Sequence, residues 1–217
     1  MVRFDCEKFR DDAVCLWKEA FGDSEEYIDF FHQTHGSCQC LTHAENGRLA
    51  SALYLIDGEL CGKKGYYLFA AATFSAYRGN GCMAKLLEKA KRFAADNSKS
   101  FIALVPAEKS LFGYYSRFGY KTAFYAVRQN NKSITDYEFD SRFVWCSEHI
   151  NYIKAEHEKY GTDISEYCGE LYSVFDGEYI KTPAPMCVDN RYGMLLPLDG
   201  EAQQLTRLNL YIGLTME

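Results

Sequence analysis

The sequence predicts an α/β (α+β) fold, in which helices and strands are mixed along the chain. Some segments carry apolar side chains at the spacing of an amphipathic helix, and others are short apolar or aromatic runs bounded by glycine-containing turns. The apolar fraction of 47% and the aromatic fraction of 16% are those of a folded globular protein. Up to about residue 128, the expected order of elements is α-α-β-β-β-α-β-α-β.

The first sixty residues are expected to form two helices and a hairpin. Residues 6–21 have helical periodicity, and a shorter helix follows, capped by Asp23 or Ser24. Two strand-like runs flank the turn signal Glu45-Asn46-Gly47, which predicts a hairpin. A second tight turn at Asp57-Gly58 is expected to lead into the buried strand YYLFAAATF.

The following segment alternates helix and strand. A helix is expected from about residue 81 to 95, because Met83, Leu86, Leu87, Ala90 and Ala94 share one face. FIALV then indicates a buried strand, EKSLFGYYSRF a short helix, and YKTAFYAVR another strand.

The C-terminal part, residues 129–217, is expected to be an α+β extension of a first domain that spans 1–128. Ser147 and Gly161 bound a predicted helix, and a hairpin is expected about Asp176-Gly177. RYGMLLPL and LNLYIGLTM are strand-like. The pattern leaves two options open, a small second domain or an extension of the first sheet.

Composition excludes several classes of protein. The net charge is −6 and no basic run is present, which disfavours nucleic acid as the main partner. No apolar run reaches the roughly 18 residues that a membrane span requires, and the N-terminus has no apolar signal core. We therefore expect a cytoplasmic protein without a membrane partner, whose nine scattered cysteines are reduced and mostly buried.

One cluster contains metal-ligand types. His32, His35, Cys38, Cys40 and His43 lie within twelve residues, but their spacing matches no familiar zinc pattern. Cys38 and Cys40 also fall on one face of an expected strand, as core residues would. No metal is predicted.

The stretch Arg78-Gly79-Asn80-Gly81-Cys82-Met83 lies between a strand and a helix. Glycines there allow a pyrophosphate to approach the unpaired N–H groups of the first helical turn, and Arg78 adds a positive charge. A turn that needs glycine backbone angles is the alternative. A dinucleotide-binding loop is set aside because Ala84 stands where its third glycine belongs, and a Walker loop because no Gly-Lys-Ser/Thr follows.

Two motifs in this order resemble the GNAT (Gcn5-related N-acetyltransferase) superfamily. Tyr77 to Gly81 match Tyr-Arg-Gly-x-Gly, a frequent form of its Gln/Arg-x-x-Gly-x-Gly/Ala segment. Tyr115, Gly119 and Tyr120 match the later Tyr-x-x-x-Gly-Phe segment with one aromatic exchange. The resemblance covers roughly residues 1–128 and implies a mixed, mostly antiparallel central sheet flanked by helices.

The resemblance also implies a cofactor, acetyl-CoA, and the residues that hold it. Backbone N–H groups of Gly79, Asn80, Gly81, Cys82, Met83 and Ala84 would face the pyrophosphate, with the Arg78 side chain nearby. Backbone groups of Ala71 and Thr73 would pair with the pantetheine arm. Tyr115 would protonate the departing thiolate, since a phenol with a reference pKa of about 10 keeps its proton at neutral pH.

The chain departs from the family pattern at Ala76, Ser75 and in "LVPAE", where many members have Gln or Arg, proline and asparagine. "LVPAE" with "YSRFGY", and the long C-terminal half, look more like the enhanced-intracellular-survival branch of the superfamily. Residues 129–217 would then be a truncated second GNAT-like unit.

The resemblance implies direct transfer of acetyl from acetyl-CoA to an amine, with CoA as product. We expect a small-molecule acceptor, and the net negative charge of the chain favours a cationic one. A homodimer is left open. No general base is identified: Glu26 and His32 lie on the segment that commonly lines the acceptor cleft, and Glu217 is a candidate by resemblance alone. The alternatives are transfer of a longer acyl group and a non-catalytic CoA-binding module.

Overall fold

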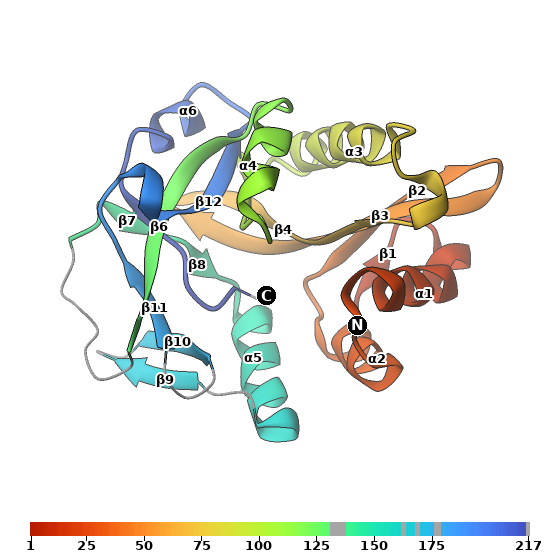
Figure 1. Ribbon diagram of the computed structural model, residues 1–217, viewed down its shortest axis with the longest axis horizontal. Coiled ribbons are helices and arrows are strands. Elements are labelled where there is room, and N and C mark those ends of the chain that lie inside the picture. Colours follow the sequence, from red (N-terminus) through yellow and green to blue (C-terminus); the bar gives the residue numbers. More distant parts are fainter. Residues whose placement is uncertain (131–137, 162–163, 168–169, 176–178, 216–217) are drawn as a thin grey trace.

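The computed structural model describes residues 1–130, 138–161, 164–167, 170–175 and 179–215 (Figure 1). It confirms an α+β architecture with one large mixed sheet. The helices are α1 (Arg10–Phe21), α2 (Glu25–Thr34), α3 (Cys82–Asp96), α4 (Lys109–Ser116), α5 (Ser147–Tyr160) and α6 (Ala202–Leu205). The strands of the N-terminal part are β1 (Arg3–Phe4), β2 (Gln39–Glu45), β3 (Arg48–Leu60), β4 (Lys63–Thr73), β5 (Phe101–Leu104) and β6 (Lys121–Asn130).

The C-terminal part contributes further strands to the same sheet. They are β7 (Ser141–Arg142), β8 (Val144–Trp145), β9 (Ile164–Tyr167), β10 (Glu170–Phe175), β11 (Tyr179–Pro183), β12 (Arg191–Pro197) and β13 (Leu210–Tyr211). The strand order is β1-β2-β3-β4-β5-β12-β6-β11-β10-β9, so β12 lies between β5 and β6 and pairs antiparallel with both. Strand pairing thus joins the C-terminal part to the first sheet, while the boundary at 128/129 stays a prediction.

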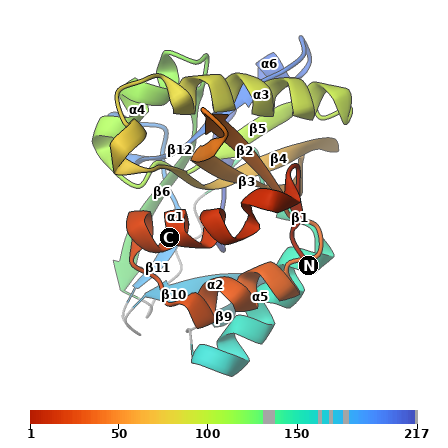
Figure 2. The same ribbon diagram turned by 90° about the vertical axis from the view of Figure 1, so that its right-hand side faces the viewer.

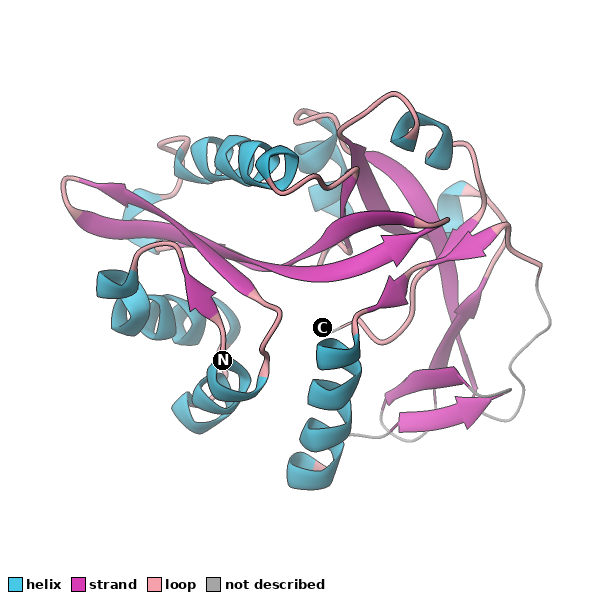
Figure 3. Cartoon of the chain, turned by 180° about the vertical axis from the view of Figure 1, so that it is seen from behind, coloured by secondary structure: helices cyan, strands magenta, loops and turns pink. Residues whose placement is uncertain are grey.

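Helices cover both faces of the sheet. Figure 2 shows α3 and α4 on one side and α1, α2 and α5 on the other, and from behind the long strands form one curved layer between them (Figure 3). Successive side chains of β3 point to opposite faces of the sheet, so the strand contributes to two hydrophobic cores. Leu53 and Leu55 pack with α3 and α4, whereas Tyr54 and Ile56 pack with α1 and α2.

Most predicted helix boundaries agree with the structure. Ser24 caps α2, because its Oγ accepts a hydrogen bond from the Tyr27 amide at 3.2 Å. Gly161 ends α5 in the left-handed conformation, with φ of +71°. The cap of α5 differs by one residue: Cys146 takes the N-cap position and Ser147 is the first helical residue.

The predicted turn at Asp57-Gly58 is wrong. Strand β3 continues through both residues, which pair with Tyr66 and Gly65, and the turn comes at Cys61-Gly62. Gly58 is needed for another reason, because a Cβ there would overlap the ring of Phe143. The hairpin of β10 and β11 is present, and its predicted turn residues Asp176 and Gly177 lie outside the described residues.

The described cysteines are free thiols, but fewer are buried than expected. Cys38, Cys40 and Cys82 are buried, whereas Cys15, Cys61 and Cys187 are exposed. Cys168 lies outside the described residues. In the described part of the chain, no helix combines the length and the apolar character needed to cross a membrane.

Candidate functional site

The site is built around a gap between β4 and β5. These neighbours run parallel and pair over Gly65–Tyr67 and Phe101–Ala103, after which β5 ends and β4 continues to Thr73. Along the opposite edge, pairing with β3 shifts register near Ala70, whose φ of +46° is unusual for a residue with a side chain. The splay leaves the β5-facing edge of β4, which includes Ala71 and Thr73, without a strand partner in the described chain.

The glycine turn has the backbone conformation that requires glycine. Gly79 and Gly81 have φ of +81° and +74°, and a Cβ at either position would meet nothing within 4 Å. The two explanations left open by the sequence therefore both hold for the backbone: the angles are left-handed, and the space beside the glycines is open.

Several amides of this turn point away from other backbone partners. In the described chain, the N–H groups of Gly79, Gly81, Cys82, Met83 and Ala84 donate no hydrogen bond, whereas that of Asn80 reaches the Tyr77 carbonyl at 3.4 Å. The peptide dipoles of the four-turn helix α3 add a positive field at this end. The arrangement suits an anion.

A groove of 530 Å³ lies against this turn. Of the predicted cofactor residues it brings together Thr73, Arg78, Gly79, Gly81, Cys82, Met83 and Ala84, while Asn80 is exposed and does not line it. The exposed Arg78 side chain folds back, and its Nε donates to the Thr73 carbonyl at 3.1 Å.

Arg117 is a second cation in the groove, which the sequence reasoning missed. Its guanidinium lies 5.0 Å from the centre of the Tyr114 ring, and both residues line the groove together with Arg78. The signal was local, since Arg117 falls inside the motif that contains Tyr115. Two guanidinium groups and the open amides give the groove a positive character.

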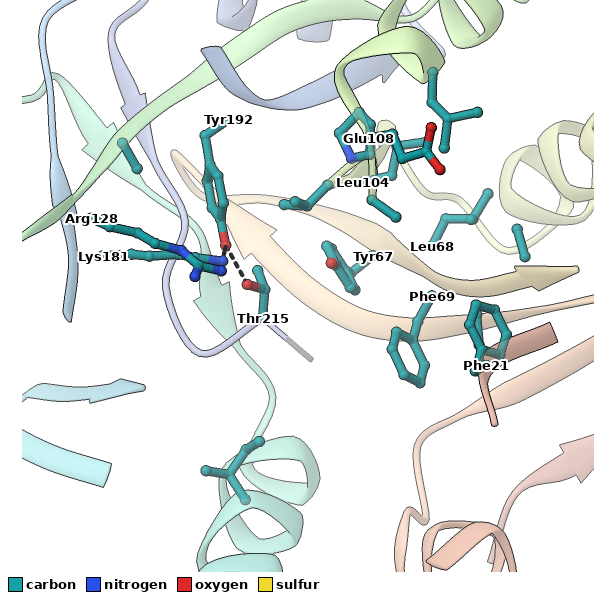
Figure 4. Close-up of a pocket in the computed structure, with 18 of the residues that line it drawn as sticks. Phe21, Tyr67, Leu68, Phe69, Leu104, Glu108, Arg128, Lys181, Tyr192 and Thr215 are labelled. Atoms are coloured by element: carbon teal, nitrogen blue, oxygen red, sulfur yellow. Dashed lines mark hydrogen bonds between the residues drawn. The ribbon is translucent and has the colours of Figure 1, made fainter. Parts of the chain in front are cut away.

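A second, larger cavity of 1220 Å³ adjoins the groove (Figure 4). Ala71 lines the cavity and Thr73 the groove, two residues apart on β4; Tyr115 lines the cavity and its neighbour Tyr114 the groove. The two hollows therefore meet along β4 and α4. The predicted site residues are divided between them at this junction.

Tyr115 is buried, with 9% of its surface exposed, and faces the cavity. Burial, with a smaller effect of Tyr114, raises the pKa of Tyr115 to about 12. Its hydroxyl makes no hydrogen bond with another described residue. The phenol is thus protonated at neutral pH and available to a group in the cavity.

Of the general-base candidates considered from the sequence, Glu26 and His32 do not line the cavity. Glu26 is exposed and pairs with Lys159 at 3.1 Å, and His32 is a core residue whose Nε2 lies 2.9 Å from the Tyr54 hydroxyl. Burial lowers the pKa of His32 to about 4. Glu217 lies outside the described residues.

The cavity instead contains charged residues from the C-terminal half, which no local motif signalled. At one end, Lys181 Nζ donates to the Tyr192 hydroxyl at 2.8 Å, and that hydroxyl lies 2.5 Å from Thr215 Oγ1, with Arg128 beside them (Figure 4). Burial, followed by the charge of Arg128, lowers the pKa of Lys181 to about 7. Elsewhere the buried Glu156 on α5 lines the cavity.

The histidines and cysteines of the candidate metal cluster do not converge. His35 pairs with His149 at 3.1 Å, and Cys38 and Cys40 are buried in the core. In the described chain, the group whose ligand atoms lie within 4.8 Å of one another is His43, Glu45 and Cys82. Glu45 of this group already forms an ion pair with Lys85, whose Nζ lies 2.5 Å from Glu45 Oε1.

Comparison with protein families identifies the fold. Residues 2–123, which contain both motifs, the β4–β5 splay and the glycine turn, match the acetyltransferase (GNAT) domain family. The chain belongs to the GNAT acetyltransferase family. The predicted membership is confirmed, and with it the mixed sheet flanked by helices. No curated protein matches the sequence.

Solved GNAT structures share the fold of this chain. A GCN5-related N-acetyltransferase from Kribbella flavida aligns with a TM-score of 0.58 and 14% identity, over 91% of this chain and 71% of that one. Eis1 from Mycobacterium abscessus aligns with a TM-score of 0.59 and 10% identity, over 93% and 74%. A probable N-acyltransferase from Enterococcus faecalis is longer: the match, at 16% identity and TM-score 0.49, covers 56% of this chain and 32% of that one.

Proposed function

We propose that this GNAT protein transfers acetyl from acetyl-CoA directly to the amine of a small molecule. The observation that carries the proposal is the junction of the two hollows. A positively charged groove with open backbone amides meets a large cavity at β4 and α4, and Tyr115 lines that cavity. A cofactor in the groove would present its thioester to the cavity.

Each predicted residue has a role in this proposal. The amides of the 79–84 turn, with Arg78 and Arg117, hold the phosphates, and the unpaired edge of β4 at Ala71 and Thr73 holds the pantetheine arm. Arg78 leaves the Thr73 carbonyl when the groove is filled.

In the reaction, the amine nitrogen bonds to the acetyl carbon and the carbon–sulfur bond breaks. The thiolate takes a proton from Tyr115, and the nitrogen loses one to water. An alkylamine with a pKa near 10.4 must first be deprotonated, which costs about 4–5 kcal/mol at pH 7. Product release and reprotonation of Tyr115 complete the cycle.

Calorimetric titration of acetyl-CoA and CoA tests the cofactor site. We expect micromolar binding to the wild-type protein and at least a tenfold loss in Gly81→Trp, because the indole would fill the groove and a side chain is strained at φ of +74°. Circular dichroism confirms that the variant is folded. Absence of binding to the folded wild-type protein would exclude the proposal.

Two alternatives are separated by turnover measurements. A CoA-binding module without catalysis would bind both ligands and acetylate none of a panel of amines. The volume of the cavity, 1220 Å³, also accommodates a longer acyl chain, and a higher kcat/KM with longer acyl-CoA donors would favour that donor class over acetyl-CoA. Cytoplasmic location and a homodimer stay predictions.

A further inference from the structure

Glu156 is a buried carboxylate without a cationic partner in the described chain. It is 8% exposed, and its Oε1 accepts hydrogen bonds from the Tyr27 hydroxyl at 2.6 Å and the Tyr152 hydroxyl at 2.8 Å. It makes no ion pair with any residue that the structure describes. Tyr27 comes from α2 and Glu156 from α5, so the cluster also joins these helices.

The second oxygen of Glu156 is available to the cavity. Oε2 has no hydrogen bond with a described residue, and it is not among the buried polar atoms that lack a partner. Because Glu156 lines the large cavity, Oε2 has access to what the cavity contains. One oxygen is thus fixed by phenols, and the other is available to a ligand.

A second acid and several aromatic rings surround the same end of the cavity. The Asp23 carboxylate accepts from Trp17 Nε1 at 2.7 Å and pairs with no cation in the described chain. Its charge, together with that of Glu156, adds to burial in raising the pKa of Tyr27. The aromatic residues that line this end are Trp17, Phe21, Tyr27 and Tyr160. Aromatic faces and carboxylates attract ammonium groups.

The cavity is electrically polarised. Arg128 on β6 and Lys181 on β11 lie together on one side, whereas Phe21, two residues before Asp23, lies on the opposite side (Figure 4). A cation would therefore be repelled beside Arg128 and Lys181 and attracted at the end defined by Asp23, Tyr27 and Glu156, which we call the acidic end.

Burying a carboxylate without a counter-ion is unfavourable, and two phenol donors offset only part of this. A cation in the cavity would complete the site. We propose that the acidic end binds a second ammonium group of the acceptor, so that the acceptor is a diamine or polyamine held by one amine while another reacts. This inference rests on the proposed N-acetyltransferase function, and Glu156 is a positioning residue in it.

The test compares linear α,ω-diamines with monoamines of the same length. Binding is measured by calorimetry on the wild-type protein and on Glu156→Gln, and acetyl transfer by steady-state kinetics. We expect the wild-type protein to prefer the diamine, and Glu156→Gln to weaken diamine affinity and raise its KM roughly 10- to 100-fold, as for loss of a charged hydrogen bond. Monoamine parameters change little.

Glu158→Gln is the matched control, because Glu158 is exposed on the same helix and does not line the cavity. It should keep the wild-type preference. If Glu156→Gln does not fold, Asp23→Asn supplies the second variant, with the same direction of change. A purely structural role of Glu156 would lower the thermal stability while leaving the diamine-to-monoamine ratio intact.

The outcomes separate this inference from the function on which it rests. Diamine binding that depends on Glu156, without acetyl transfer to any amine, would support the acidic end and refute the enzyme. Equal KM values for diamines and monoamines in the wild-type protein would overturn the inference. A diamine-to-monoamine KM ratio that is unchanged in Glu156→Gln would do the same. In both cases, observed acetyl transfer would still support the proposed enzyme.

Discussion

At the scale of the residue, Tyr115 and Tyr114 show how one step along a helix divides two environments. Their rings are in edge contact, with centroids 5.3 Å apart, yet Tyr115 faces the cavity and Tyr114 the groove. In the proposed reaction, Tyr115 is the one placed to give a proton to a thiolate at the junction. The two residues are of the same type, so their different proposed roles follow from the different hollows that they line.

We therefore predict that Tyr115→Phe lowers kcat about 100- to 10,000-fold, the range for loss of a general acid. The affinity for acetyl-CoA should be unchanged, because the ring remains. Stopped-flow or steady-state assays give kcat, and calorimetry gives the affinity. Tyr114→Phe should leave both kcat and the affinity near their wild-type values, because Tyr114 lines the groove and keeps the ring that contacts Arg117. A large loss of kcat at Tyr114 but not at Tyr115 would reverse the two assignments.

Prediction from sequence identified those candidate site residues whose pattern is local. The glycine turn stood out by its position between a strand and a helix, and Tyr115 was identified through the resemblance of its contiguous motif to the GNAT family. Glu156 could not be found this way, because its partner Tyr27 is 129 residues away in sequence and a glutamate on a helix usually indicates a solvated face. Gly58 was misread for the same reason: the ring of Phe143 that requires it comes from a distant segment.

At the scale of elements, a pair of buried histidines joins α2, α5 and the C-terminal segment. His149 Nε2 donates to the Leu214 carbonyl at 3.1 Å, so its Nδ1 accepts from His35 Nε2 at 3.1 Å. His35 Nδ1 is then a buried acceptor without a donor in the described chain. The His149 ring must be neutral for this arrangement, because its Nδ1 accepts a hydrogen bond while its Nε2 donates one.

The histidine pair predicts a loss of stability in mild acid. Burial is the main cause that lowers the pKa of His149 to about 3 and of His35 to about 4, from 6.5. The unfolded chain therefore binds more protons below pH 6.5, and the stabilisation present above 6.5 is lost as the pH falls toward 4. Each proton contributes up to about 1.4 kcal/mol per pH unit.

Urea unfolding between about pH 7.5 and 5 measures this effect. The free energy of unfolding should fall with pH in the wild-type protein, and less steeply in His149→Gln, which removes one of the titrating groups. Equal slopes in the two proteins would show that the pair is not the source of the acid sensitivity.

At the scale of the whole molecule, the middle of the sheet is completed by a strand that comes late in the chain. Residues 191–197 form β12 between β5 and β6, and Met194, Leu195 and Leu196 are buried there. Local patterns predicted this segment as a strand but not its neighbours, because pairing with strands far away in the sequence leaves no periodic signal. The family match, which ends at residue 123, likewise stops before β12.

This topology predicts that a fragment of residues 1–128 does not fold alone. Without β12, the edges of β5 and β6 would be unpaired, and apolar side chains beneath them, such as Leu104 and Phe124, would meet water. Circular dichroism and size-exclusion chromatography of the fragment should show loss of cooperative unfolding or aggregation. The matched control is the full chain, purified in the same way. A monomeric fragment that unfolds cooperatively and binds acetyl-CoA would instead establish 1–128 as an independent domain, with β12 an addition to it.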